Sequence, residues 1–521
     1  MLKSKEAAKS VAIIIIFSFG GKFLGFIREI LIGAKFGSGT ETDTYFLAMT
    51  AISLFTSLIT TSINTTMIPV LAEVEKLEGN EGKGTHTNNL LNIMMSIAIV
   101  ITFIAWLTSP LIIKILAPGF VKNINQYNLA ILLMKIGLPA IILAGAQGVF
   151  RGYLQSEHMF METAAISFPH NFTYIIFLLF LSNKFGIKGL MVTSVLATVS
   201  QIFLQLRGLK KTNYSYKYIL DFKDKYVGKM LYLITPILLS IGIDDLNKII
   251  DKSMASNLVK GSISALNYAN RLDGLVRGVF IAAIATVMYP MLSQEANKGT
   301  YDGFKRAIVK GTNIIFLITI PATVGMMILA NPITKFAFQR GAFDSIATFM
   351  TAGALIFTVV GMVGSSLRTL LNNVFYSLQD TRTPVVNGTI AVAINVVFNL
   401  ILIKPMAHNG LALATSISAT VASILLLYGL RKKIGPFGFF DSVKCGFKSL
   451  IASLVMGISV YFLHNYLRQV LSEGRLMEFI ALIGVVGVGA IIYSILIYLL
   501  KVEEVNWVVD IVKGKLNKQG K

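Results

Sequence analysis

The stretch "FGGKFLGFIREIL", residues 19–31, places three charged side chains inside a long apolar run. The apolar residues "VAIIIIFSF" lead into it, and Lys22, Arg28 and Glu29 interrupt it. About 20 mostly apolar residues are enough to cross a bilayer as a helix. Charged residues inside such a helix are costly, so they pair with one another, meet water or bind a ligand. The stretch predicts a membrane helix with a functional or paired charge cluster.

The composition of the whole chain favours a membrane protein. Hydrophobic residues make up 54% of it, charged residues only 14%, and the mean hydropathy is +0.70. Soluble domains carry about 25% charged residues. The apolar runs are too long for strands of a β-barrel, so they predict an all-α polytopic protein.

About fourteen runs are long enough to be membrane-spanning helices. They lie at 10–33, 43–71, 90–117, 127–152, 160–182, 186–206, 228–250, 264–292, 307–330, 346–377, 384–403, 409–430, 446–466 and 477–500. The first is preceded by basic residues but has no small-residue cleavage site after it, so we expect it to be retained.

The basic residues are distributed unevenly between the two sides of these spans. The net charge is +21, and 28 of the 47 Lys and Arg residues fall on the side of the N-terminus. Cytoplasmic loops are the ones enriched in Lys and Arg. The excess predicts that both termini are cytoplasmic, and it needs no nucleic-acid partner.

Similar segments recur about 221 residues apart. "KGLMVTSVLATVSQIFL" from residue 188 matches "NGLALATSISATVASIL" from residue 409. Three further pairs have nearly the same offset, beginning at 67 and 288, 109 and 331, and 148 and 373. The repeat predicts two six-helix lobes at 1–222 and 223–435, two extra helices at 436–500 and a cytoplasmic tail at 501–521. An even number of spans in each lobe makes the repeats parallel, an arrangement found in transporters.

Charged residues inside the spans gather in the first helices of the two lobes. We expect these residues to face one cavity between the lobes. They are Lys22, Arg28, Glu29, Asp244, Lys248, Asp251, Arg271, Asp273 and Arg277.

Some of these charges are spaced to form pairs. Local pairing predicts Lys22 with Glu29, Lys248 with Asp244 or Asp251, and Arg277 with Asp273. Apart from Lys22, these acidic and basic residues are candidates for gating or ion coupling.

Arg28 and Arg271 have no obvious local partner, and we expect them to bind substrate. Cations in a membrane cavity indicate an anionic substrate, and arginine suits phosphate oxygens. The GxxxG spacing of Gly21 and Gly25 predicts close helix packing instead of a binding role.

Other classes of site receive little support. Cys445 is the single cysteine and the five histidines are scattered, so we predict no metal site. There is no Walker A motif. The pair Asp244–Asp245 raises the possibility of a metal-dependent glycosyltransferase, but no sizeable catalytic loop accompanies it. We expect no catalytic residues and no cofactor, with a coupling cation or the membrane potential as the driving force.

Several motifs resemble the MurJ/MviN family of lipid II flippases. The similarity is carried by "LGFIREILIGAKFGSGTETDTYFLA" from residue 24, "FQRGAFD" from 338, "FYSLQDTRTPV" from 375 and "NLILIKPMAHNGLALATSISA" from 399. The resemblance implies fourteen helices, two lobes around a cationic cavity, and a groove for the undecaprenyl tail formed by the last two spans.

The resemblance also implies site residues. The family's essential basic residues in its first span match Lys22, usually arginine there, and Arg28. Its acidic residue at the start of the second span matches Asp43, and an arginine of the eighth span matches Arg271. This chain departs from the family in having no basic residue within 43–71 and in having Gly274 where an acidic residue is usual.

We therefore predict a flippase of the bacterial cytoplasmic membrane. Its substrate would be lipid II, moved from the inner to the outer leaflet by alternating access, with membrane lipids and the cell-wall synthesis machinery as partners. The pyrophosphate would contact Lys22, Arg28 and Arg271, and Asp43 is a further substrate-binding candidate. The alternatives are a flippase for another polyprenyl-linked glycan, such as a teichoic acid, capsule or O-antigen unit, and a cation-coupled drug exporter of the same superfamily.

Overall fold

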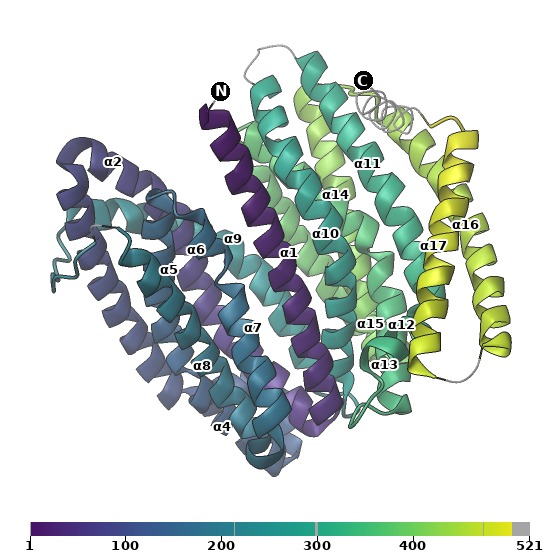
Figure 1. The fold of residues 1–521 in the computed structure, drawn as a ribbon, viewed down its shortest axis with the longest axis horizontal. Helices are drawn as coiled ribbons and strands as arrows, with labels where there is room; N and C mark the ends of the chain where they lie inside the picture. Colours follow the sequence, from purple (N-terminus) through teal and green to yellow (C-terminus); the bar gives the residue numbers. More distant parts are fainter. Residues whose placement is uncertain (1, 213, 297–300, 472–473, 503–521) are drawn as a thin grey trace. The chain divides into compact units, whose positions relative to one another are not determined.

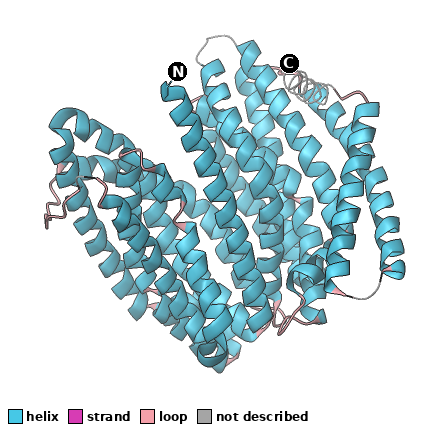
Figure 2. Cartoon of the chain, in the orientation of Figure 1, coloured by secondary structure: helices cyan, strands magenta, loops and turns pink. Residues whose placement is uncertain are grey.

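The computed structural model describes residues 2–212, 214–296, 301–471 and 474–502. These residues form helices joined by loops, and none of them lies in a strand (Figure 2). The chain divides into two compact units. The first is Met1–Ser264 with Arg340–Asp344, and the second is Ala265–Gln339 with Ser345–Lys521. Most of the tail predicted at 501–521 lies outside the described residues.

The first unit contains the N-terminal helices. They are α1 (Leu2–Phe36), α2 (Thr40–Leu107), α3 (Ser109–Leu116), α4 (Ile124–Gly137), α5 (Pro139–Ser156), α6 (Phe160–Ala164), α7 (Ser167–Ile176), α8 (Ser182–Leu209) and α9 (Lys225–Ala255), with a 3₁₀ turn at Pro118–Lys122 and a π turn at Phe177–Leu181 (Figure 1). Pro110 and Pro139 stand in the first turns of α3 and α5. Proline fits there because its missing N–H has no partner in the first turn of a helix.

The second unit contains the remaining helices. They are α10 (Ser262–Ala296), which begins in the first unit, α11 (Tyr301–Ile328), α12 (Ala330–Phe338), α13 (Ser345–Val360), α14 (Met362–Ser377), α15 (Arg382–Ile434), α16 (Phe439–Val470) and α17 (Arg475–Leu499).

Each predicted span falls on helical segments, but the helix boundaries differ from the prediction. Seven helices or continuous helical segments of the described chain are long and apolar enough to cross a membrane, or eight if the bent pair α13 and α14 forms one span. The helix α15 contains two predicted spans, and α2 contains one together with most of a second, 90–117, which continues into α3. The number fourteen therefore stays a prediction. Residues 73–88, predicted as a loop, are helical within α2 apart from a break at Gly79.

Backbone irregularities recur at the offset of the sequence repeat. Gly186 breaks α8 with φ 55°, and Ala407 breaks α15 with φ 50°. His158 and Gln379, which follow α5 and α14, have φ of 58° and 57°. Both pairs are 221 residues apart, so the repeat seen in the sequence also appears in the backbone. The compact units divide the chain near 264, while the repeat boundary near 222 stays a prediction.

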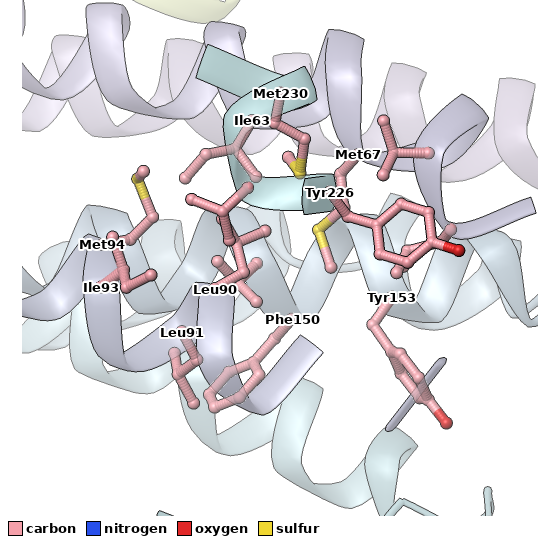
Figure 3. Close-up of a cluster of buried hydrophobic side chains, with 14 of the residues drawn as sticks. Ile63, Met67, Leu90, Leu91, Ile93, Met94, Phe150, Tyr153, Tyr226 and Met230 are labelled. Carbon is pink, nitrogen blue, oxygen red and sulfur yellow. The ribbon is translucent and has the colours of Figure 1, made fainter. Parts of the chain in front are cut away.

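Each unit has its own apolar core. In the first, Figure 3 shows Ile63 and Leu90 of α2 among side chains of α5 and α9, including Phe150 and Met230. In the second, α11, α14 and α15 surround a cluster of apolar side chains that includes Phe304, Leu371 and Leu426. Removing apolar surface from water stabilises a fold by about 25 cal/mol per Å². This contribution applies to the parts of each core that would otherwise contact water.

The helices α16 and α17 pack on α11. Ser449 Oγ donates to Phe316 O, and Tyr493 Oη donates to Leu317 O. These contacts attach the two helices outside the predicted repeat to the second unit.

Candidate functional site

The face of α1 that contains Gly21 and Gly25 packs closely against α7. A Cβ atom on Gly21 would collide with Ser167 Oγ, and one on Gly25 would lie 3.7 Å from Asn171 Oδ1. Asn171 Nδ2 also donates to Gly21 O at 3.2 Å. The small residues therefore serve helix packing, as the GxxxG spacing predicts.

Arg28 continues this face of α1 and has a local partner. Its Nη2 lies 2.9 Å from Glu29 Oε1, and only 16% of its side chain is exposed. The guanidinium carbon lies 5.0 Å from the centre of the Tyr174 ring. The prediction that Arg28 lacks a local partner is wrong. Adjacent helical residues point about 100° apart, so spacing alone does not suggest this pair, but the long arginine side chain bridges the gap.

Two tyrosines complete the surroundings of Arg28. Tyr174 Oη and Tyr45 Oη lie 3.3 Å apart, and both side chains are buried. Since Tyr45 belongs to α2 and Tyr174 to α7, three helices fix this position. Arg28 is thus an oriented cation beside a buried carboxylate.

Lys22 lies two turns before Glu29 and is exposed on α1. The sequence predicted that Lys22 pairs with Glu29. In the structure, the Glu29 carboxylate contacts Arg28. An exposed ammonium group is accessible to water or to an anionic ligand.

Asp43 is buried in a set of structural hydrogen bonds. Gly261 N donates to its Oδ2 at 2.6 Å, and the Ser264 N and Oγ donate to Oδ1 at 2.7 and 2.6 Å. The side chain is 3% exposed. These bonds tie the start of α2 to residues 261–264, whereas the resemblance implied a role beside the substrate.

The acidic and basic residues of α9 pair differently from the prediction. Lys248 Nζ lies 2.7 Å from Asp245 Oδ1, an i, i+3 contact. Ser57 Oγ of α2 donates to Asp245 Oδ2 at 2.9 Å. The predicted partners were Asp244, whose side chain lies outside the described residues, and Asp251. The tertiary contact with Ser57 favours Asp245, because it places that carboxylate against α2.

The second unit contains the pair predicted in α10. Arg277 Nη2 lies 2.9 Å from Asp273 Oδ2, which confirms the i, i+4 prediction. Asp273 is buried, and Arg271, two residues earlier on α10, is exposed.

A polar cluster that was not predicted from the sequence surrounds the break in α2. We call it the α2 elbow, and it consists of Glu75, Glu78, Lys83, His86, Glu157 and Asp224. Lys83 is only 1% exposed, and its Nζ lies 2.8 Å from Glu75 and 2.6 Å from Glu157. The mixture of Glu, Lys and His within 73–88 could have indicated a cluster of ion pairs. The contributions of Glu157 and Asp224 could not be predicted, because only folding brings them to this segment.

His86 connects two carboxylates of the elbow. Its Nε2 lies 2.8 Å from Glu78 Oε2, and its Nδ1 lies 2.5 Å from Asp224 Oδ2. Hydrogen bonds from His86, Lys225 and Tyr226 lower the pKa of Glu78 to about 2. Burial raises the pKa of Asp224, but hydrogen bonds from His86 and Asn89 outweigh it, so the net shift is downward. The elbow therefore depends on ionised carboxylates.

In the described part of the chain, no group of three or more His, Cys, Asp or Glu residues is arranged to hold a metal ion. Within the predicted spans, the charged groups on α1 are Lys22, Arg28 and Glu29, and those on α10 are Arg271, Asp273 and Arg277. The cations among them can bind an anion, and each ion pair can exchange partners.

The chain is similar to known proteins over nearly its whole length. The family model described as "Lipid II flippase MurJ" matches residues 32–482. A probable lipid II flippase MurJ of Rickettsia prowazekii is 27% identical over 499 residues, covering 95% of this chain and 98% of that protein. A probable lipid II flippase MurJ of Vibrio cholerae is 28% identical over 513 residues, covering 96% of this chain and 97% of that protein.

A solved structure agrees in fold. "Lipid II flippase MurJ, inward closed conformation" has a TM-score of 0.77 at 24% identity, covering 93% of this chain and 97% of that one. Since the family model covers most of the sequence, the chain belongs to the lipid II flippase MurJ family.

Proposed function

We propose that this protein moves lipid II from the inner to the outer leaflet of the bacterial cytoplasmic membrane. The observation that carries the proposal is the family match over residues 32–482. The long apolar helices provide the membrane setting. The proposed role is transport, with no chemical step on the substrate.

In this proposal the pyrophosphate of lipid II is bound by Lys22 and Arg28. Lys22 is exposed on α1, and Arg28 is oriented by Glu29 and Tyr174. The Arg28 Nε is shielded from solvent and has no hydrogen-bond partner among the described residues, so a change in its surroundings as the site opens would free it to donate to the substrate. Charge-assisted hydrogen bonds to phosphate are stronger than those between neutral groups.

Arg271 is proposed as a further pyrophosphate ligand because it is exposed on α10. The pairs Asp245–Lys248 and Asp273–Arg277 are proposed to change partners as the site opens to each leaflet in turn. Asp244 and Asp251 stay candidates for the same role. A coupling cation or the membrane potential supplies the driving force.

The remaining parts of the proposal concern the surroundings of the protein. Both termini lie in the cytoplasm, α16 and α17 accommodate the undecaprenyl tail, and cell-wall synthesis enzymes use the delivered lipid. The positive-inside distribution of Lys and Arg supports the orientation.

The function is tested with purified protein in liposomes that contain fluorescent lipid II. Wild type should expose the lipid to an added outer-leaflet enzyme, and Lys22→Ala and Arg28→Ala should lower the rate at least tenfold. Lys404→Ala removes an exposed charge from α15 and is the matched control. Failure of wild type to flip lipid II under an imposed potential or ion gradient would reject the function. Normal flipping and binding by both variants would reject the site.

A further inference from the structure

A cavity in the second unit lies apart from the residues discussed so far. Its volume is about 590 Å³, and its walls come from α12, the last turns of α16 and the first turns of α17. Two contacts hold α12 and α17 together here. Lys335 Nζ lies 2.5 Å from Glu478 Oε1, and the rings of Phe336 and Phe479 stack with centres 4.9 Å apart.

The lining of the cavity is apolar on one side and polar on the other. Leu329, Leu467 and Leu482 line it and belong to the apolar cluster formed by α11, α16 and α17. Asn331 and Asn465 are among the polar residues of the lining. A ligand for this cavity needs both a polar group and a hydrophobic part.

The charges that line the cavity favour a singly charged anion. Lys335 and Glu478 neutralise each other. Arg468 lines the cavity too, and within the described residues it forms no ion pair, so it adds one positive charge. The Nδ1 of His464, also in the lining, is shielded from solvent and has no hydrogen-bond partner in the described protein.

The predicted span boundaries place the cavity near the depth of lipid headgroups. The predicted span 446–466 ends and the predicted span 477–500 begins beside it, and Tyr461 and Tyr466 of α16 are exposed. Tyrosine is enriched where a membrane protein crosses the interface between hydrocarbon and water. A ligand that enters from the bilayer therefore reaches Arg468 with its headgroup.

From these observations we propose that the cavity binds the phosphate headgroup of an anionic glycerophospholipid such as phosphatidylglycerol. The phosphodiester carries one negative charge, which matches Arg468. His464 and the asparagines interact with the phosphate and glycerol oxygens. The acyl chains lie on the exposed apolar surface of α16, where Ile458 and Phe462 are exposed. The pyrophosphate of a polyprenyl lipid carries more charge than the single unneutralised arginine here balances.

The test is native mass spectrometry of the full-length protein titrated with phosphatidylglycerol or phosphatidylcholine of the same acyl chains. Wild type should bind one phosphatidylglycerol at least tenfold more tightly than phosphatidylcholine. Arg468→Gln should abolish that preference. Arg475→Gln is the matched control, since it removes the same charge at the start of α17, where Arg475 does not line the cavity. Equal effects of the two variants would show general surface attraction and overturn the proposal.

A second variant tests the cavity without changing its charge. Ala481 lines the cavity and is buried, so Ala481→Phe should fill the space and weaken the tight binding about tenfold. Unchanged binding by this folded variant would overturn the proposal.

Competition identifies the source of the phosphate. Glycerol phosphate at millimolar concentration should not displace the lipid, and undecaprenyl pyrophosphate should displace it no better than phosphatidylcholine does. Displacement by glycerol phosphate would indicate a site for free phosphates. Displacement by undecaprenyl pyrophosphate would indicate a substrate site. Either result would overturn the assignment to a bilayer phospholipid.

Discussion

At the scale of single residues, the arginine in the first helix owes its position to its neighbours. Glu29 supplies a buried carboxylate and Tyr174 an aromatic ring, so Arg28 has one preferred orientation. A buried ion pair is weak evidence for stability, but removing one partner leaves the other charge without compensation. The Arg28–Glu29 pair therefore affects both the proposed substrate binding and the stability of the fold.

We expect Glu29→Gln to destabilise the protein by about 3 kcal/mol, because it leaves the Arg28 cation poorly compensated. The double change Arg28→Gln with Glu29→Gln should recover part of that loss. Unfolding free energies measured in bicelles for the two single variants and the double variant give the coupling energy. Strictly additive effects would show that the pair does not stabilise the fold.

At the scale of elements, the breaks in α8 and α15 are equivalent positions with different residues. Gly186 adopts φ 55° and ψ −153°, and Ala407 adopts φ 50° and ψ −129°. Glycine adopts such backbone angles without strain, whereas other residues incur a cost of about 1–3 kcal/mol. The second copy of the repeat keeps the break despite its side chain.

We expect Ala407→Gly to stabilise the protein by about 1 kcal/mol, since it removes that strain. The matched variant Gly186→Ala should destabilise it by a similar amount. Thermal unfolding of both variants in one detergent provides the measurement. A loss of stability in Ala407→Gly would mean that contacts of the methyl group exceed the backbone strain.

The α2 elbow is a second feature of this scale, and it responds to pH. Folding lowers the pKa of Glu78 from 4.5 to about 2 and lowers that of Asp224 below 3.8. The folded elbow therefore binds fewer protons than the unfolded one. Its contribution to stability is present above about pH 4.5 and is lost as the pH falls towards 2.

We expect the backbone amide of Asp221, which donates to Asn89 Oδ1, to lose protection from hydrogen exchange between pH 4.5 and 2, after correction for the intrinsic rate. Asn88, Asn89 and Asn92 of α2 hold the segment 215–221 through its backbone, next to His86. Glu78→Gln should reduce the pH dependence. The same dependence in wild type and Glu78→Gln would assign the effect to other carboxylates.

At the scale of the whole molecule, the orientation in the membrane follows from the distribution of positive charge. The segments at 73–88 and 207–227 carry many of the basic residues assigned to the cytoplasm. Exposed positions at Glu81 and Lys217 represent the two segments, and Lys260 represents the opposite side.

Single cysteines at Glu81 and Lys217, in a Cys445→Ser background, should resist a membrane-impermeant thiol reagent in intact cells. A cysteine at Lys260 should react. Labelling is measured before and after the cells are opened, which shows that each site is reactive once exposed. Labelling of the Lys217 position from outside would reverse the predicted orientation.

The sequence alone determined the features that depend on local order along the chain. Apolar length predicted membrane helices, motif similarity indicated the family, and recurrent segments gave the offset at which Gly186 and Ala407 break their helices. The pair Asp273–Arg277 was also predictable, because i, i+4 residues share one face of a helix.

Tertiary structure decided which partner each remaining charge received. Packing of α1 on α7 gave Arg28 its surroundings, the start of α10 at residues 261–264 engaged Asp43, and Ser57 selected Asp245. These contacts join residues more than 100 positions apart. Spacing along one helix cannot predict them, because the neighbours of a buried charge are set by helices that pack against it.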